Sequence, residues 1–230
     1  MGVFEALKTF LVGHRGVPEL ELENTLQSIE KAIELGAHVV EVDIQRTRDG
    51  VFMLSHDDNL LRVFGVGLNV RDASWEEVAK VQKNGYRPAR LEEAFELVKG
   101  KVGLFLEIKH PEDAEGVYKK VLEYKAEEWT AIISFYPQAL EVLRGKITTG
   151  LVYSKPPGMI PEAKKLGCLF VLPKYGLATQ KAVDFAHRLK LKVVAWTVND
   201  PQKARELFER GVDGIATDNV KKLKDTTLST

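Results

Sequence analysis

The stretch that decides the fold runs from residue 24 to residue 44 and reads NTLQSIEKAIELGAHVVEVDI. Its first half predicts a helix, because apolar residues recur on one helical face from Leu26 to Ile33 and a capping Asn-Thr pair precedes them. Gly36 ends this helix. The second half, His38–Ile44, is a short β-rich apolar run and predicts a strand. A helix followed at once by such a strand is typical of a repeating β/α architecture.

The same alternation continues along the chain and predicts eight strands joined by helices. The predicted strands are Thr9–Gly13, His38–Ile44, Val102–Ile108, Thr130–Phe135, Thr148–Tyr153, Cys168–Leu172, Lys192–Trp196 and Val212–Ala216. Three later helices show the same apolar spacing, over residues 91–98, 182–189 and 204–208. Eight β/α units in 230 residues fit a closed (β/α)₈ barrel, the TIM barrel, although an open doubly wound sheet gives much the same linear pattern. We favour the barrel.

Length and composition fit one globular domain over residues 1–230. Hydrophobic residues make up 44% and charged residues 29% of the chain, which excludes a disordered or fibrous protein. One irregular stretch, Asp57–Ala89, interrupts the rhythm between the second and third predicted strands and contains Gly65, Gly67 and Pro88. We interpret it as a small insertion after the second strand.

Charge and cysteine content narrow the possible partners. Lys plus Arg and Asp plus Glu both total 33, so no overall basic field attracts nucleic acid or an anionic membrane. The single cysteine, Cys168, cannot form an internal disulfide. No stretch approaches the ~20 apolar residues of a membrane-spanning helix, and Glu5 lies where a signal peptide requires basic residues. We expect a cytoplasmic protein that binds a small molecule, without nucleic acid or stable membrane insertion; its oligomeric state stays open.

Acidic residues are the first sign of chemistry. Glu41 and Asp43 lie two residues apart on a strand and so face the same side, which we expect to be the interior or mouth of the barrel. The alternative is a strand whose acids face solvent. Glu107 and Lys109 repeat the spacing on the next predicted barrel strand, and sequential parallel strands are usually neighbours. Three carboxylates are therefore expected to converge, although Glu107 and Lys109 alone would be interpreted as a solvated ion pair.

A hairpin is expected to add a histidine to this acidic group. Asp49 and Gly50 lie between two strand-like runs, which is the strongest short-range hairpin signal. With these two residues as the loop, Asp43 lies opposite His56 across the hairpin. A longer loop would shift this register.

A second histidine follows the first predicted strand, in the segment Gly13-His14-Arg15-Gly16. Active sites of barrel enzymes lie at the carboxyl ends of the strands. A lone histidine there is structural about as often as functional, but the flanking glycines permit a sharp turn and close approach of a ligand.

Together these residues predict a metal site beside an anion site. An all-carboxylate set without cysteine suits a hard divalent ion, Mg²⁺, Ca²⁺ or Mn²⁺, and not structural zinc. Arg15 and Lys109 add positive charge suited to a phosphate ester. His14 and His56 can exchange protons near neutral pH.

The ordered motifs resemble the glycerophosphodiester phosphodiesterase family, from about residue 10 to about residue 222. The motifs are His14-Arg15-Gly16, Glu23-Asn24-Thr25, Glu41-Val-Asp43, Arg48-Asp49-Gly50 with His56-Asp57, Glu107-Ile-Lys109, Trp196-Thr-Val-Asn199, and Gly211-Val-Asp-Gly-Ile-Ala-Thr-Asp218. The resemblance implies a phosphodiesterase barrel with a small insertion after the second strand. The implied site residues are Glu41, Asp43 and Glu107 for the metal, His14 and His56 for acid–base catalysis, and Arg15, Lys109 and Trp196 for the substrate.

The resemblance also implies a reaction. One histidine deprotonates the glycerol 2-hydroxyl, which attacks phosphorus to form a cyclic phosphate while the metal and Arg15 polarise the phosphoryl oxygens. The other histidine protonates the departing alcohol, and water then opens the ring to give glycerol phosphate. Rival hypotheses are an enzyme that stops at the cyclic phosphate or acts on lysophospholipids, a phosphosugar enzyme on the same fold, and a catalytically silent binding module.

Two departures from the family pattern bear on these hypotheses. Leu22 replaces the usual proline before the Glu-Asn-Thr motif, and we expect this to alter only the local turn. Residues 58–68 are more apolar than is usual in the family, and we expect them to form a small hydrophobic cluster under the insertion. The alternative hypothesis is that this segment forms an apolar rim that accepts a lipid chain, which would make lysophospholipids substrates. Its residues would be Leu60, Leu61, Val63, Phe64 and Leu68.

Overall fold

The computed structural model describes residues 2–156 and 159–227, which form a closed barrel of eight parallel strands with one extra strand beside it. The barrel strands are β1 (Phe10–His14), β2 (Val39–Arg46), β4 (Gly103–Ile108), β5 (Thr130–Ser134), β6 (Thr148–Tyr153), β7 (Phe170–Pro173), β8 (Lys192–Ala195) and β9 (Gly214–Thr217). Strand β1 is hydrogen-bonded to β2 on one side and to β9 on the other, so the sheet closes on itself.

This closure decides between the two architectures that the sequence left open. The predicted TIM barrel is confirmed, and each of the eight predicted strands overlaps an observed one. An open doubly wound sheet would leave β1 and β9 unpaired with each other. The ends of the predicted domain, Met1 and residues 228–230, lie outside the described residues.

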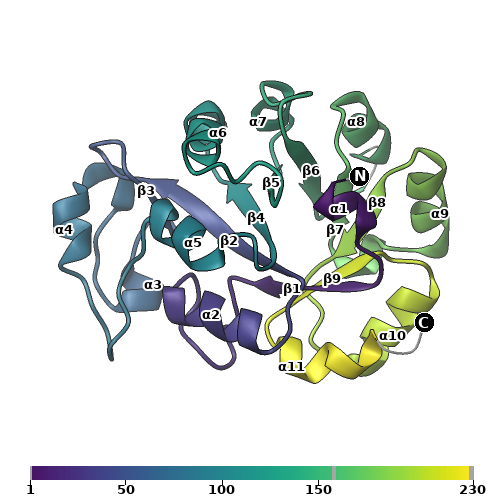
Figure 1. The fold of residues 1–230 in the computed structure, drawn as a ribbon, viewed down its shortest axis with the longest axis horizontal. Helices are drawn as coiled ribbons and strands as arrows, with labels where there is room; N and C mark the ends of the chain where they lie inside the picture. Colours follow the sequence, from purple (N-terminus) through teal and green to yellow (C-terminus); the bar gives the residue numbers. More distant parts are fainter. Residues whose placement is uncertain (1, 157–158, 228–230) are drawn as a thin grey trace.

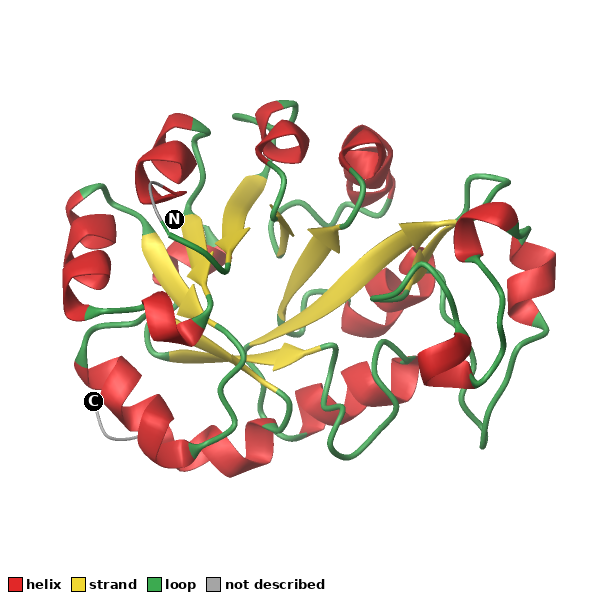
Figure 2. Ribbon diagram, turned by 180° about the vertical axis from the view of Figure 1, so that it is seen from behind, coloured by secondary structure: helices red, strands yellow, loops and turns green. Residues whose placement is uncertain are grey.

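Helices surround the barrel in a ring (Figures 1 and 2). They are α2 (Leu26–Glu34), α5 (Leu91–Val98), α6 (Ala114–Glu123), α7 (Pro137–Glu141), α8 (Met159–Lys165), α9 (Gln180–Arg188), α10 (Pro201–Glu209) and α11 (Val220–Leu223), with the short 3₁₀ helices η2 (Pro111–Asp113), η3 (Tyr175–Leu177) and η4 (Lys224–Thr226). Of the Asn-Thr pair before α2, Thr25 is the cap, because its Oγ1 accepts a hydrogen bond from the Ser28 backbone N–H at 3.2 Å. The apolar helix faces pack against the outside of the barrel, which leaves the barrel interior to form a separate core.

Aromatic rings fill the amino-terminal end of the barrel. The short helix α1 (Val3–Ala6) inserts Phe4, whose ring centroid lies 5.7 Å from that of Phe105 and 5.8 Å from that of Phe170. Gly103 makes room for it, since a Cβ on this residue would lie 2.8 Å from the Phe4 ring. The barrel floor is thus closed by packed rings, and its carboxyl-terminal end remains available for ligands.

The predicted hairpin exists, but its register differs from the prediction. Strand β3 (Phe52–Leu54) pairs antiparallel with the carboxyl-terminal end of β2. The loop has three residues, with the Thr47 N–H donating to the Val51 carbonyl and Gly50 at φ +85°. A type I turn followed by a left-handed residue is the usual three-residue hairpin loop, and an Asp-Gly pair suits it as well as a two-residue turn. The pairing of Asp43 with His56 is therefore wrong: Ser55 lies opposite Asp43, and His56 comes one residue later.

The irregular stretch forms a small lobe beside the barrel, at the left of Figure 1. It contains α3 (Leu61–Phe64), η1 (Val70–Asp72) and α4 (Trp75–Ala79). It has its own hydrophobic cluster, made of Met53, Leu60, Phe64, Val70, Ala73, Val78 and Val81. The hypothesis of a continuous lipid-binding rim is wrong for Leu60 and Phe64, because their side chains are buried in this cluster. Leu61 is the one residue of that set whose side chain is mostly exposed, at 61%.

Candidate active site

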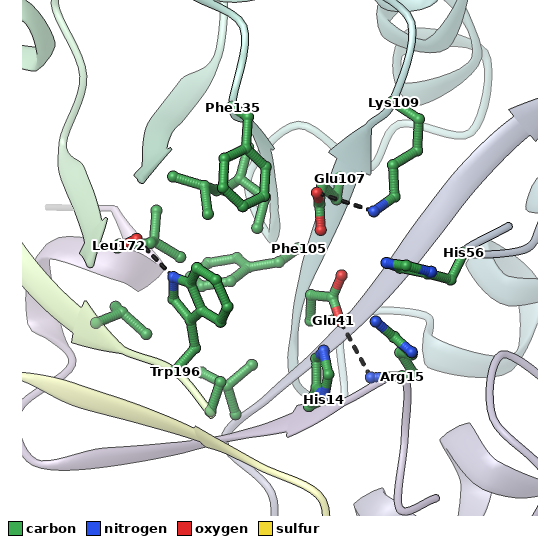
Figure 3. Close-up of a pocket in the computed structure, with 15 residues that line it drawn as sticks. His14, Arg15, Glu41, His56, Phe105, Glu107, Lys109, Phe135, Leu172 and Trp196 are labelled. Atoms are coloured by element: carbon green, nitrogen blue, oxygen red, sulfur yellow. Dashed lines mark hydrogen bonds and ion pairs between the residues drawn. The ribbon is translucent and has the colours of Figure 1, made fainter. Parts of the chain in front are cut away.

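Seven of the eight predicted site residues line one pocket of about 200 Å³ at the carboxyl ends of the strands (Figure 3), and the eighth, Asp43, is buried against Arg15 and Lys109. Polar residues line one side of it: His14, Arg15, Glu41, His56, Glu107 and Lys109. Apolar side chains, including Phe135, Leu172 and Trp196, line the opposite side. The pocket therefore has a charged half and an apolar half.

Three carboxylates converge in the charged half, and we call them the acidic triad: Glu41, Asp43 and Glu107. The register of β2 with β4 places Asp43 directly beside Glu107, and Glu41 shares their face two residues earlier on β2. One oxygen from each side chain lies within 4.8 Å of the others. All three side chains face the barrel interior, with residue exposures of 4%, 0% and 9%, so the solvent-facing alternative does not hold.

Burial makes the ionised triad electrostatically costly. Burial raises the pKa of Glu41 well above its usual range, and the charges of Asp43 and Glu107 raise it further. Burial and then the charge of Asp43 raise the pKa of Glu107 to about 8. Burial alone would also raise the pKa of Asp43. The positive charges of Lys109 and Arg15 outweigh this effect, so the pKa of Asp43 is lowered. The triad thus favours an added positive charge, which a proton or a cation can supply.

Two cationic side chains stand beside the triad. Arg15 Nε lies 3.1 Å from Asp43 Oδ2, while Lys109 Nζ lies 3.2 Å from Asp43 Oδ1 and 3.1 Å from Glu107 Oε1. Both cations also line the pocket, so they lie where an anionic group would enter. Arg15 follows β1 at a positive φ of 54°, and Gly16 follows at φ +87°, with Ser28 too close to allow a Cβ there.

The triad fits a divalent metal ion. The Arg15 backbone N–H donates to Glu41 Oε2 at 3.0 Å, which fixes that carboxylate, whereas Glu41 Oε1 is buried without a hydrogen-bond partner among the described residues. Asn24 orients Asp43 in turn, donating to Asp43 Oδ2 at 3.0 Å and accepting from the Asp43 N–H at 3.1 Å. An unpartnered buried oxygen in an oxygen-only group suits a hard cation.

Each pocket histidine is held at Nδ1 by an aspartate. His14 Nδ1 lies 2.8 Å from Asp218 Oδ1, and His56 Nδ1 lies 2.8 Å from Asp57 Oδ1. Asn199 in turn donates to Asp218 Oδ2 at 2.9 Å. A carboxylate at Nδ1 orients the ring and leaves Nε2 to exchange protons with a ligand. Both rings line the pocket, so both can do so there.

The apolar half of the pocket is built from rigid aromatic contacts. Trp196 Nε1 donates to the Leu172 carbonyl at 2.7 Å, and the Phe135 ring packs against the indole with centroids 5.8 Å apart. Trp196 thus lies in the pocket, as the family resemblance implied, although periodicity alone would assign it to the core. Phe135 was expected only as the end of a strand.

Sequence reasoning did not assign roles to the residues that hold the site in place. Asn24, Asp57 and Asp218 occur in the quoted motifs, but for Asn24 and Asp218 nothing local shows what they contact. His14 and Asp218 are 204 positions apart, and only closure of the barrel through β1 and β9 brings them together. Adjacency to His56 was the one available signal for Asp57.

The other histidines lie outside the pocket. His38 Nδ1 accepts a hydrogen bond from the Leu11 N–H at 3.1 Å and so joins β1 to the start of β2. His110 is paired with Asp58 at 3.0 Å, and His187 lies on α9. None of the three lines the pocket among the residues that the structure describes.

The fold and the pocket define a class of protein: a TIM-barrel hydrolase whose carboxylate cluster can hold a divalent ion and whose cations and histidines can act on an anionic ester. Comparison with known proteins makes this specific. The model of the glycerophosphoryl diester phosphodiesterase family matches residues 14–222. The chain belongs to this family and is a glycerophosphodiester phosphodiesterase, a phosphoric diester hydrolase.

Individual relatives cover nearly the whole chain. A glycerophosphodiester phosphodiesterase of Caldanaerobacter subterraneus subsp. tengcongensis is 30% identical over 93% of this chain and 95% of its own. Human lysophospholipase D GDPD1 is 23% identical over 93% of this chain and 84% of its own. A phosphodiesterase of Oleispira antarctica, solved in complex with the product sn-glycerol-3-phosphate, shares the fold with a TM-score of 0.89 at 24% identity, and all of both chains is covered.

Among the described residues, the structure contains no helix that is long and apolar enough to cross a membrane.

Proposed function

We propose that this protein hydrolyses small glycerophosphodiesters to glycerol phosphate and an alcohol, with His14 and His56 as the acid–base pair. The observation that carries the proposal is the common pocket: two imidazoles, each held at Nδ1 by an aspartate, flank a buried acidic triad. The relative whose structure contains sn-glycerol-3-phosphate supports the identity of the product.

A divalent ion completes this site in the proposal. Glu41, Asp43 and Glu107 would hold it, with Mg²⁺, Ca²⁺ and Mn²⁺ as the candidates. When bound, the ion supplies Lewis-acid stabilisation of the charge that develops on the phosphoryl oxygens. It would also relieve the repulsion that raises the pKa of Glu41 and Glu107.

The histidines move the protons in two stages. In the first, the imidazole Nε2 of one ring takes the proton of the glycerol 2-hydroxyl, the oxygen attacks phosphorus, and the other ring protonates the departing alcohol. In the second, the protonated and neutral rings exchange roles as water opens the cyclic phosphate. Asp57 and Asp218 stabilise whichever imidazolium forms, because each accepts from Nδ1.

Arg15, Lys109 and Trp196 bind the substrate. The two cations flank the entry to the triad and hold the phosphoryl oxygens, and the Trp196 ring packs against the carbon skeleton. We further propose that residues 57–89 belong to the same single domain as the barrel, since His56 and Asp57 connect the lobe directly to the pocket.

The test is a pair of single substitutions with a matched control. His14→Ala and His56→Ala each lower kcat by about 10²–10⁴-fold, because each removes one proton-transfer group. His110→Ala is the control, since this half-buried histidine pairs with Asp58 outside the pocket and should leave kcat unchanged. Turnover of glycerophosphocholine is followed by phosphorus NMR, which also detects a cyclic intermediate. Near-normal activity in either pocket variant contradicts the proposal.

A second candidate substrate is a lysophospholipid, in the manner of the human relative named a lysophospholipase D. The apolar half of the pocket favours it, because Phe135 and Trp196 offer a surface for hydrocarbon. The small pocket volume of about 200 Å³ favours the shorter glycerophosphodiesters. Supplying a lysophospholipid and glycerophosphocholine in parallel decides between them by the ratio of kcat/KM.

A further inference from the structure

One arginine of the lobe, Arg62, contacts two carboxylates that lie beside the pocket. Arg62, on α3, donates from Nε to Asp57 Oδ2 at 2.7 Å and from its two terminal nitrogens to both oxygens of Glu23, at 2.7 and 2.9 Å. All three guanidinium nitrogens therefore engage a carboxylate, and the two carboxylates come from different segments of the chain.

Each of these carboxylates holds a residue of the pocket. Asp57 accepts from His56 Nδ1 at 2.8 Å. Glu23 accepts from Arg15 at 3.2 Å, and Arg15 in turn contacts Asp43 at 3.1 Å. Arg62 is therefore linked to the His56 imidazole through Asp57, and to the acidic triad through Glu23 and Arg15.

The contacts with Glu23 are the stronger of the two. The Glu23 side chain is only 11% exposed, so its charge requires compensation. Burial would raise the pKa of Glu23, but hydrogen bonds from Arg62 and then the charge of Arg15 lower it below its usual range. Without Arg62, Arg15 is the one remaining cation among the described ion pairs of Glu23, and Arg15 Nε also contacts Asp43.

We propose that Arg62 is a positioning residue that fixes His56 through Asp57 and Arg15 through Glu23, and so couples the lobe to the chemistry of the barrel. The inference rests on the proposed roles of His56 and Arg15. A guanidinium suits this task because its planar fork can engage two carboxylates at once, whereas an ammonium is a single point charge.

A second arginine of the lobe provides a matched control. Arg71, on η1, also contacts two carboxylates, Asp113 at 2.9 Å and Glu112 at 3.1 Å, and ties the lobe to the barrel at η2. Neither of these carboxylates contacts a pocket histidine or Arg15 among the described ion pairs. If Arg62 only anchored the lobe, loss of either arginine would have the same consequence.

The experiment compares kcat, KM and melting temperature for Arg62→Gln, Arg62→Lys and Arg71→Gln. Loss of a group that orients a functional residue costs about 10- to 100-fold in activity. We expect Arg62→Gln to lower kcat by that factor, Arg62→Lys to recover only part of it, and Arg71→Gln to keep the original kcat. Combining Arg62→Gln with Asp57→Asn should cost less than the product of the single losses, because both act on the same histidine.

Three outcomes overturn the inference: an unchanged kcat in Arg62→Gln, an equal loss in Arg71→Gln, or losses that multiply in the double variant. His56→Ala is measured in the same series to separate this inference from the proposed function. A normal Arg62→Gln beside an inactive His56→Ala refutes only the positioning role. An active His56→Ala refutes the catalytic assignment itself.

Discussion

Replacing one member of the acidic triad should have opposite effects on stability with and without metal. We consider Glu41→Gln, which removes one negative charge from a group whose oxygens lie within 4.8 Å of one another. The amide oxygen of glutamine can still accept the hydrogen bond that the Arg15 N–H donates to Glu41. The substitution therefore changes charge with little change in shape.

The magnitude follows from the spacing. Two unit charges 4.8 Å apart repel by about 3.5 kcal/mol at an effective dielectric constant of about 20. Protonation limits this cost, and Arg15 and Lys109 offset part of it, so we expect a net gain of about 1–3 kcal/mol in the metal-free protein. For a chain of 230 residues, this corresponds to a melting temperature higher by about 2–12 °C.

With metal bound, the original protein should be more stable than Glu41→Gln. An ion present at a thousand times its dissociation constant stabilises the folded protein by about 4.1 kcal/mol, which exceeds the gain expected from removing the repulsion. Glu41→Gln lacks one of the three ligands, so most of this stabilisation should be lost.

Thermal unfolding in EDTA and in excess Mg²⁺, Ca²⁺ or Mn²⁺ measures both effects. Glu141→Gln is the control for loss of a carboxylate, because this α7 side chain is 55% exposed and far from the triad in the sequence. A Glu41→Gln protein that is less stable in EDTA would refute the repulsion within the triad, and one that gains as much from metal as the original protein would show that Glu41 is not a metal ligand.

Three further predictions concern the floor, the triad and the pocket wall. Phe4→Ala should destabilise the protein by about 3–5 kcal/mol in denaturant unfolding while sparing kcat, because this buried ring packs at the far end of the barrel. In the metal-free protein, the free energy of unfolding should fall as pH rises from about 4.5 to about 8. The reason is that burial and then the charge of Asp43 raise the pKa of Glu107 from its ordinary 4.5 to about 8, so the folded state retains a proton that the unfolded chain releases; calorimetry across this range with EDTA tests the sign. Trp196→Ala should raise KM more than it lowers kcat, since this ring forms a wall of the pocket and does not transfer protons, and steady-state kinetics separates the two.

The barrel could be predicted because its signals are local and repeated. Each strand is a short apolar run, and α2 shows its apolar face and its capping residue within a few positions of one another. Helices α7 and α8, with five and seven residues, were not identified, because so few positions cannot display a helical period. The aromatic floor was not predicted either. Phe4 lies in a four-residue helix, which is too short to show a helical period, and its packing partners come together only in the closed barrel.

The sequence predicted which residues form the site, but not all of the contacts between them. Period-2 spacing placed Glu41 and Asp43 on one face, and the neighbouring strand brought Glu107 beside them. The hairpin register was misjudged because an Asp-Gly pair is compatible with two loop lengths, and local sequence does not choose between them. The pairing of Arg62 with Glu23 spans 39 positions and depends on how the lobe folds back over the barrel.

The two histidines depend on different parts of the fold. His14 is held by Asp218, so its orientation follows from the pairing of β1 with β9, which is part of the buried barrel. His56 is held by Asp57, whose other partner is Arg62 on a four-residue helix with a side chain 52% exposed. Local opening is cheapest where few apolar contacts are buried. Damage to the barrel should therefore appear first as lost stability, and damage to the lobe as lost turnover in a protein that still melts normally.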